Sequence, residues 1–169
     1  MSYSNVRSKL SRAIAAYLIS AGCGTAVDTS ASNVTSDSTY PRTTVKSGIA
    51  TPEVPMSGIY RIRVMISVKG SAANSFDNAD MRVAFDNRVA AVYDAMMQSS
   101  DGTSLNYTAN EITTAGRAIR TTTGNSDMAD FTCMSLYDGG FGEGEASEEG
   151  TAWEEILIFD AVCCASALT

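Results

Sequence analysis

The residues of this chain best suited to chemistry are its carboxylates. Two adjacent glutamate pairs, Glu148/Glu149 and Glu154/Glu155, suggest acid–base catalysis, which needs two carboxyl groups facing one substrate. Neighbours along a loop or strand do not face one another, so we expect no catalytic residues here. The acidic segment 138–149 offers oxygen atoms of the kind that Ca²⁺ binds, but it lacks the ligand order of a calcium-binding loop. We therefore expect a solvated loop, with no metal site and no cofactor.

Histidine is absent from all 169 residues, which excludes Ser-His-Asp and Cys-His catalysis and every histidine-ligated metal site. The four cysteines, Cys23, Cys133, Cys163 and Cys164, include no CxxC spacing. Adjacent Cys163 and Cys164 point to opposite faces of a strand, so they do not bind one metal together. We expect four buried free thiols, and we expect that the protein is not an enzyme.

Charge is distributed unevenly along the chain. All 12 basic residues lie in residues 1–120 with nine acidic ones, which gives this part a charge of +3. Residues 121–169 hold ten acidic residues and no lysine or arginine, which gives −10. Because phosphate contacts need cations, the acidic part is not expected to bind nucleic acid or anionic lipid.

The N-terminal segment admits two interpretations. Arg7, Lys9 and Arg12 precede an apolar run that ends at Cys23, which looks like a lipoprotein signal. Ser20, three residues before the cysteine, replaces the aliphatic residue usual in such signals. Apolar residues at helical spacing instead predict an amphipathic helix over residues 4–21. No run reaches the 18 or so apolar residues of a membrane span, and we expect no membrane association.

Hydrophobic periodicity predicts the remaining elements. Helices are expected at residues 77–98 and 108–119, the second opened by a capping box from Thr108 to Glu111. Strands are expected at residues 43–49, 60–69, 131–137 and 153–164. The segment 60–69 has one apolar face and one face with Arg61, Arg63 and Lys69.

These elements predict an α+β fold in a single domain, residues 1–169. We expect a small, mainly antiparallel sheet with two amphipathic helices packed on one face. A Ser/Thr-rich arm or loop is expected at residues 25–51, either as a solvated loop or as a contact with a neighbouring subunit. A Gly/Glu-rich acidic loop is expected at residues 138–150.

The candidate functional residues form a subunit or partner interface. A basic strand face in one copy is complementary to acidic residues in a neighbouring copy, although a solvated sheet face also explains it. Such a contact joins different surfaces of two copies, and contacts of this kind close into rings or grow into filaments. The candidate residues are Tyr40, Arg42, Arg61, Arg63, Lys69, Glu143, Glu145, Glu148 and Glu149.

The order of elements resembles a known family. The helix around Ser8–Leu18 (SKLSRAIAAYL), the prolines at 52 and 55, and the strand Gly58–Val68 (GIYRIRVMISV) precede a helix with Phe85–Met96 (FDNRVAAVYDAM). With the closing strand Trp153–Phe159 (WEEILIF), this layout is similar to tail terminator, or tail-completion, proteins of long-tailed bacteriophages.

The resemblance implies a non-enzymatic virion structural protein of the tail and neck, assembled in the host cytoplasm. It implies a homo-oligomeric, six-fold ring that ends the tail tube and joins it to the head connector. Its partners would be tail-tube and connector proteins, and DNA would pass through an acidic lumen without being specifically bound. Two alternatives stay open: a head-completion, connector or minor tail protein of the neck, and a secreted or lipid-anchored bacterial binding domain.

Overall fold

A computed structural model of the protein describes residues 3–24, 26–28, 41–71, 78–97, 107–119, 128–143 and 152–164. Three helices and five strands occur within these residues. In chain order they are α1 (Tyr3–Ser20), β1 (Ala26–Asp28), β2 (Arg42–Pro52), β3 (Ile59–Ser71), α2 (Asn78–Met97), α3 (Tyr107–Ala118), β4 (Thr132–Glu143) and β5 (Ala152–Cys164).

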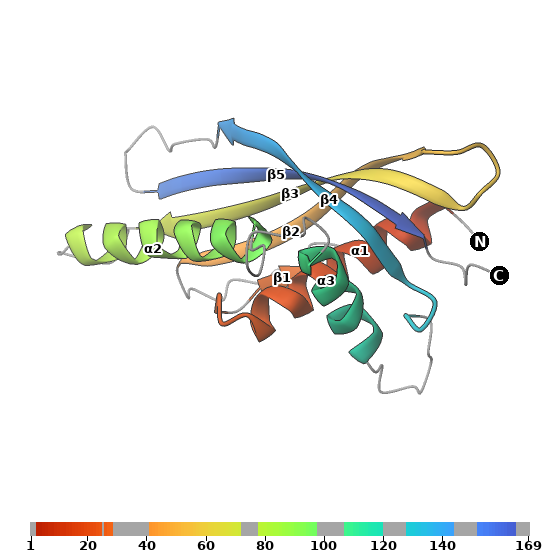
Figure 1. Ribbon diagram of the computed structural model, residues 1–169. Helices are drawn as coiled ribbons and strands as arrows, with labels where there is room; N and C mark the ends of the chain where they lie inside the picture. The colour runs from red at the N-terminus through yellow and green to blue at the C-terminus, as the bar shows by residue number, and fades with distance from the viewer. Residues whose placement is uncertain are drawn as a thin grey trace.

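The strands form one sheet in the order β1-β2-β3-β5-β4. The four long strands are antiparallel to their neighbours, and the three-residue strand β1 pairs in parallel with the outer edge of β2. Strands β3 and β5 pair along their whole length, from Ile59 opposite Cys164 to Ser71 opposite Ala152. All three helices lie on one side of this sheet (Figure 1). The α+β fold expected from the sequence is confirmed, with three helices on the covered face.

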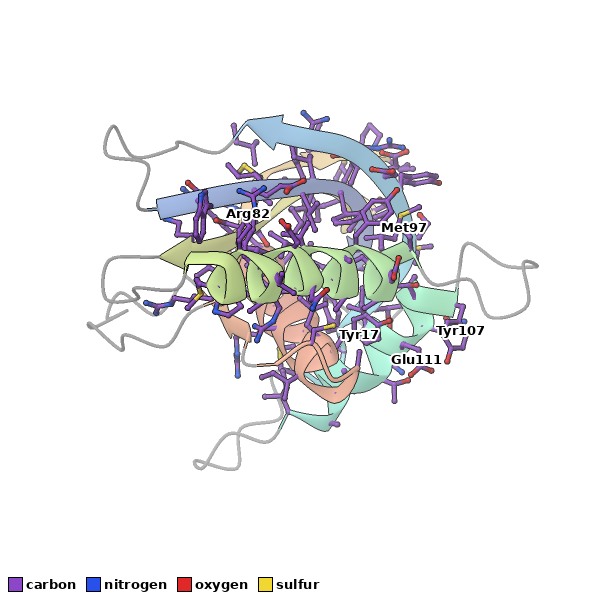
Figure 2. The ribbon with its side chains drawn as sticks, turned by 90° about the vertical axis from the view of Figure 1, so that its left-hand side faces the viewer. Tyr17, Arg82, Met97, Tyr107 and Glu111 are labelled. Atoms are coloured by element: carbon purple, nitrogen blue, oxygen red, sulfur yellow. The ribbon has the colours of Figure 1, made fainter. Side chains whose placement is uncertain are left out.

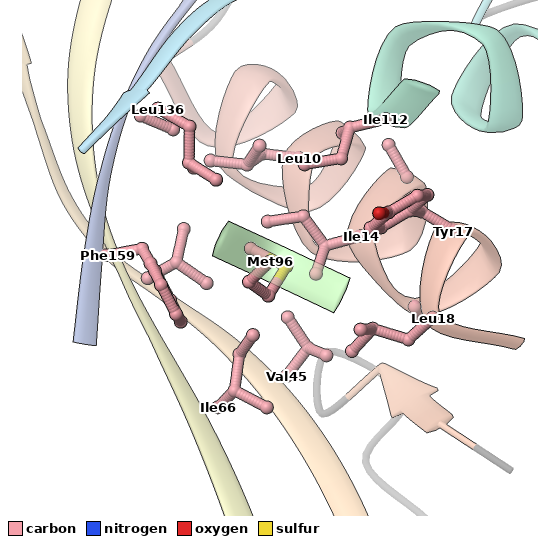
Figure 3. Close-up of a cluster of buried hydrophobic side chains, with 14 of the residues drawn as sticks. Leu10, Ile14, Tyr17, Leu18, Val45, Ile66, Met96, Ile112, Leu136 and Phe159 are labelled. Atoms are coloured by element: carbon pink, nitrogen blue, oxygen red, sulfur yellow. The ribbon is translucent and has the colours of Figure 1, made fainter. Parts of the chain in front are cut away.

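The alternation of β3 builds the floor of the core. Ile62, Val64, Ile66 and Val68 are fully buried under the helices, while the residues between them point to the other side of the sheet. Figure 3 shows side chains of α1, α2 and α3 gathered above this floor, with Met96 of α2 in their midst. One hydrophobic core therefore joins the sheet to all three helices.

Helix α1 is an integral part of that core. Val6, Leu10, Ile14 and Leu18 are almost completely buried. Burying each such side chain stabilises the fold by roughly 1.5–3 kcal/mol. Cleavage before Cys23, as in a lipoprotein signal, would remove all four side chains, so the packing favours a structural helix here.

A polar contact fixes α1 to β2 within this apolar surrounding. The Arg7 guanidinium Nη2 donates to the Ser47 carbonyl at 2.9 Å, and the Ser11 and Ser47 hydroxyl oxygens are 2.6 Å apart. Hydrogen bonds of this kind satisfy polar groups that would otherwise be costly to bury. They also set where α1 lies along β2.

Helix α3 begins at Tyr107, one residue earlier than expected. Thr108 therefore lies inside the helix, where it is buried and hydrogen-bonds the side chain of Tyr17. The predicted capping box is wrong in this respect, because Thr108 lies inside the helix and not just before its first residue. Gly116 lets α3 approach α1 closely, since a Cβ atom there would lie 2.8 Å from the Cβ of Ala13.

Helix α2 packs near the end of the sheet that lies opposite to α3 (Figure 1). Phe85 contacts Trp153 of β5 with ring centroids 6.1 Å apart, and Gly70 leaves room for both rings. At the other end of α2, the Tyr17 hydroxyl donates to the Ala95 carbonyl at 2.6 Å. Burial raises the pKa of Tyr17 to about 12.

The sheet extends into both segments that the sequence indicated as loops. Strand β2 covers Arg42–Pro52, longer than the expected 43–49, because its pairing with β3 runs from Arg42 to Pro52, with Thr43, Val45 and Ser47 buried in alternation. Strand β4 continues to Glu143, where the sequence predicted an acidic loop from Asp138. A bulge between Asp138 and Gly140 accommodates this, with Gly140 at φ 92°. Residues 29–40 and 144–151 lie outside the described part of the chain.

Candidate interaction surface

One face of the sheet has none of the described helices over it (Figure 1). Directly opposite residues of antiparallel strands share a face, so the register identifies its members. We call this surface the open face. It comprises Arg42, Thr44, Lys46 and Thr51 of β2; Arg61, Arg63, Met65, Ser67 and Lys69 of β3; Glu154, Ile156, Ile158, Asp160 and Val162 of β5; and Ser135 and Tyr137 of β4.

Charged side chains on the open face pair across neighbouring strands. Arg63 lies directly opposite Asp160, and two nitrogens of its guanidinium bind the two carboxylate oxygens at 3.0 and 3.2 Å. Lys69 lies opposite Glu154 with 3.5 Å between Nζ and Oε1. The Ser67 hydroxyl also donates to that carboxylate. The hydrogen bonds that Arg63 donates to Asp160 raise the pKa of Arg63.

A third ion pair, between Arg61 and Glu53, lies at the end of the β2–β3 hairpin. Two guanidinium nitrogens of Arg61 donate to the two carboxylate oxygens of Glu53, each at 3.0 Å. This hydrogen bonding lowers the pKa of Glu53. The Arg61 guanidinium also lies over the Tyr137 ring, 5.5 Å from its centroid. Exposed ion pairs of this kind add little stability, but they fix the direction of the charges that the surface presents.

Apolar side chains occupy the middle of the open face. Met65 lies directly opposite Ile158, and Ile156 lies opposite Ser67 on the same side. All three side chains are only half-buried. Ion pairs therefore surround a partly exposed apolar centre, which is the usual composition of protein contact surfaces.

The structure brings four of the predicted interface residues together. Arg42, Arg61, Arg63 and Lys69 all lie on the open face. Glu143 ends β4 directly opposite Glu155, away from this group. Tyr40, Glu145, Glu148 and Glu149 lie outside the described residues.

The acidic partners of Arg63 and Lys69 come from the same chain, which the sequence did not indicate. Asp160 and Glu154 belong to the acidic C-terminal part, so some of the expected charge complementarity is satisfied within one subunit. Alternation along β5 puts Glu154 and Asp160 on one face, and this much was readable from the sequence. The residues opposite them could be known only from the strand register.

The remaining candidates for chemistry are separated or buried. Glu154 and Glu155 point to opposite faces of β5, as adjacent strand residues do. Cys133 and Cys163 lie opposite each other, and all four cysteines are free thiols and buried, as predicted. Burial raises the pKa of the Cys163 thiol well above its ordinary value.

Two further results concern the described residues as a whole. They include no group of three or more His, Cys, Asp or Glu residues placed to hold a metal ion. None of their helices has the length and apolarity needed to cross a membrane.

Comparison with known proteins identifies no family and no curated relative of this chain. No protein-family model and no curated protein matches the chain. The open face is accordingly interpreted from its own residues.

Proposed function

We propose that this protein is a non-enzymatic virion structural protein that assembles into a ring at the junction of phage tail and head. In this proposal the ring ends the tail tube and joins it to the connector. The observation that supports it best is the open face, a sheet surface of four strands with an apolar centre and oriented ion pairs. A fold uses such a surface for contact with other chains more readily than for solvation.

The layout of elements supports the same proposal. The resemblance to tail terminators rests on an N-terminal helix, an alternating strand, a helix and a closing strand, and these form α1, β3, α2 and β5. The uneven charge adds to it, because contact between basic and acidic surfaces of successive copies suits a ring. An acidic lumen would let DNA pass without binding it.

Electron microscopy of the purified protein, with its mass in solution, tests the proposal. We expect closed rings with a central opening and a mass six times the 17.8 kDa of the chain. Twelve-fold particles would favour the connector alternative within the same neck region. A monomer at every concentration, or a mass showing loss of residues 1–22 and addition of lipid, would contradict the proposal.

A further inference from the structure

We propose that the open face is covered by a second copy of this chain, through the outer side of that copy's α2. The inference rests on the proposed function, since it names the partner of the same surface. A contact between two different surfaces is the kind that closes into a ring. Each subunit would give its α2 to one neighbour and its open face to the other.

The outer side of α2 has its own regular composition. Val83, Asn87, Ala90 and Asp94 are all exposed, at spacings of four, three and four residues. These spacings place them on one side of a helix. Asp86, also exposed, lies beside them. We call these five residues the α2 stripe, and they combine two acids with short or apolar side chains.

The α2 stripe and the open face of one molecule do not face each other. Helix α2 packs against the covered side of the sheet through Phe85, Val92 and Met96, so its stripe points away from the sheet. Figure 2 shows α2 in the foreground between Arg82 and Met97, with no other described element over its outer side. A contact between the two surfaces therefore has to join two copies.

The two surfaces match in shape and polarity at their centres. Ala90 is short, so the helix backbone can approach the sheet closely at this point. On the open face, Met65 and Ile158 form a half-buried apolar pair that lies beside Lys46 on β2. Packing Ala90 beside this pair removes apolar surface from water on both copies.

The charges match in sign and in spacing. Asp86 and Asp94 are eight residues apart, about 12 Å along a helix. Arg42 and Lys46 are four residues apart, about 13 Å along a strand. Neither cation forms an ion pair with another described residue within 4.0 Å. Asp94 likewise has no such pair, while Asp86 pairs with Arg82 on the exposed surface at 3.2 Å. The two acids can therefore lie over the two cations when α2 runs along β2 and β3.

Charge reversal on each surface tests the contact. We expect Lys46→Glu and Asp94→Lys each to raise the concentration needed for assembly tenfold or more, because each places like charges opposite one another. The double variant, Lys46→Glu with Asp94→Lys, restores the attraction and recovers most of the assembly. Asp130→Lys, an exposed charge reversal in the segment before β4, serves as the control and leaves assembly unchanged.

Mixing the two single variants separates this contact from a symmetric one. The Lys46→Glu open face attracts the Asp94→Lys stripe, and the unchanged stripe of Lys46→Glu attracts the unchanged open face of Asp94→Lys, so only copies of the same variant repel each other. A head-to-tail contact therefore predicts that mixing restores assembly, in particles that contain the two variants in equal numbers. If the open face instead packs on itself, Lys46→Glu alone changes assembly and Asp94→Lys does not.

Disulfide trapping gives a geometric readout. The variant Met65→Cys with Ala90→Cys should form a ladder of linked copies under mild oxidation, since the two sites lie on different surfaces of one chain. Met65→Cys with Asn110→Cys, on the exposed side of α3, is the matched control and should not form a ladder. All four native cysteines are buried, so they do not compete.

The outcomes distinguish this inference from the proposed function. A wild-type monomer at every concentration contradicts the proposed function and this inference together. A ring that withstands Lys46→Glu and Asp94→Lys, each shown to be folded by circular dichroism, contradicts this inference alone. This inference alone is also contradicted if the Met65→Cys, Asn110→Cys variant forms disulfide-linked copies as readily as the Met65→Cys, Ala90→Cys variant.

Discussion

At the scale of single residues, Gly116 shows how one missing side chain sets a helix contact. Helix formation alone favours alanine over glycine by up to about 1 kcal/mol. At this position, however, an added Cβ would lie 2.8 Å from the Cβ of Ala13 and 3.1 Å from the Phe131 ring. The Ala13 Cβ is carried by the backbone of α1 and cannot move away by rotation.

We therefore predict that Gly116→Ala destabilises the protein by about 1–2 kcal/mol, since overpacking costs more than helix propensity returns. Urea denaturation followed by circular dichroism measures this. Ala118→Gly, on the exposed end of the same helix, is the control for propensity alone. A Gly116→Ala variant as stable as the wild type would show that α1 and α3 are not in close contact.

Tyr17 makes the free energy of unfolding depend on pH in the alkaline range. Its pKa is raised from 10.0 to about 12 in the folded state, chiefly by burial. The folded protein therefore holds the proton more tightly than the unfolded chain. The stabilisation is complete below pH 10 and is lost as the pH rises from 10 toward 12. Two pKa units correspond to at most about 2.7 kcal/mol.

The buried thiols of Cys23 and Cys163 also have raised pKa values, so their ionisation also lowers the free energy of unfolding above pH 9. Comparison of the wild type with Tyr17→Phe therefore isolates the contribution of Tyr17. We predict that the free energy of unfolding falls more steeply above pH 10 in the wild type than in Tyr17→Phe, as measured by urea titrations from pH 8 to 11. Equal slopes for the two proteins would contradict the assignment to Tyr17.

At the scale of elements, the β2–β3 hairpin carries its strain at its tip. Met56 is fully exposed and has φ 61°, a conformation that residues with a Cβ rarely adopt. The tip is nevertheless closed by a hydrogen bond from the Glu53 amide to the Ile59 carbonyl at 2.9 Å. The strands and the Arg61–Glu53 pair hold this turn in place.

We predict that Met56→Gly raises the thermal midpoint slightly, by a gain of up to about 1 kcal/mol, because glycine adopts this backbone conformation without strain. No packing is lost, since the Met56 side chain is exposed. Met56→Ala serves as the control, because it removes the side chain and keeps the strain. A lower midpoint for Met56→Gly than for Met56→Ala would show that the turn is not strained.

The basic residues of β3 belong to the surface of the sheet and not to its core. We predict that Arg61→Glu with Arg63→Glu weakens self-assembly tenfold or more while the monomer still unfolds cooperatively, since exposed ion pairs contribute only about 0–1 kcal/mol each. Size-exclusion chromatography with light scattering measures the first effect and circular dichroism the second. Unchanged assembly would show that this end of the open face does not contact another chain.

Local sequence patterns predicted most of the elements but not how they pair. The alternation from Tyr60 to Val68 identified β3, and the spacing of Leu10, Ile14 and Leu18 identified α1, because both patterns reflect burial on one side. Pairing of Arg63 with Asp160 joins residues 97 positions apart and depends on strand order. The β4 extension was missed because its glycines, which indicate a loop locally, form a bulge in the sheet.

At the scale of the whole molecule, the described residues form one hydrophobic core and one sheet surface that none of their helices covers. The three helices of the described residues cover one side of the sheet, and the other side displays ion pairs around Met65 and Ile158. The stripe on α2 offers the opposite sign of charge at a matching spacing. We infer that the fold is completed by its neighbours, each copy covering the sheet of the next.

The copy number in solution tests this account most directly. Native mass spectrometry over a concentration series should give a species six times the 17.8 kDa chain mass, which dissociates in Lys46→Glu and re-forms in the Lys46→Glu, Asp94→Lys double variant. A 17.8 kDa monomer at every concentration would contradict the assembly of this protein through its open face.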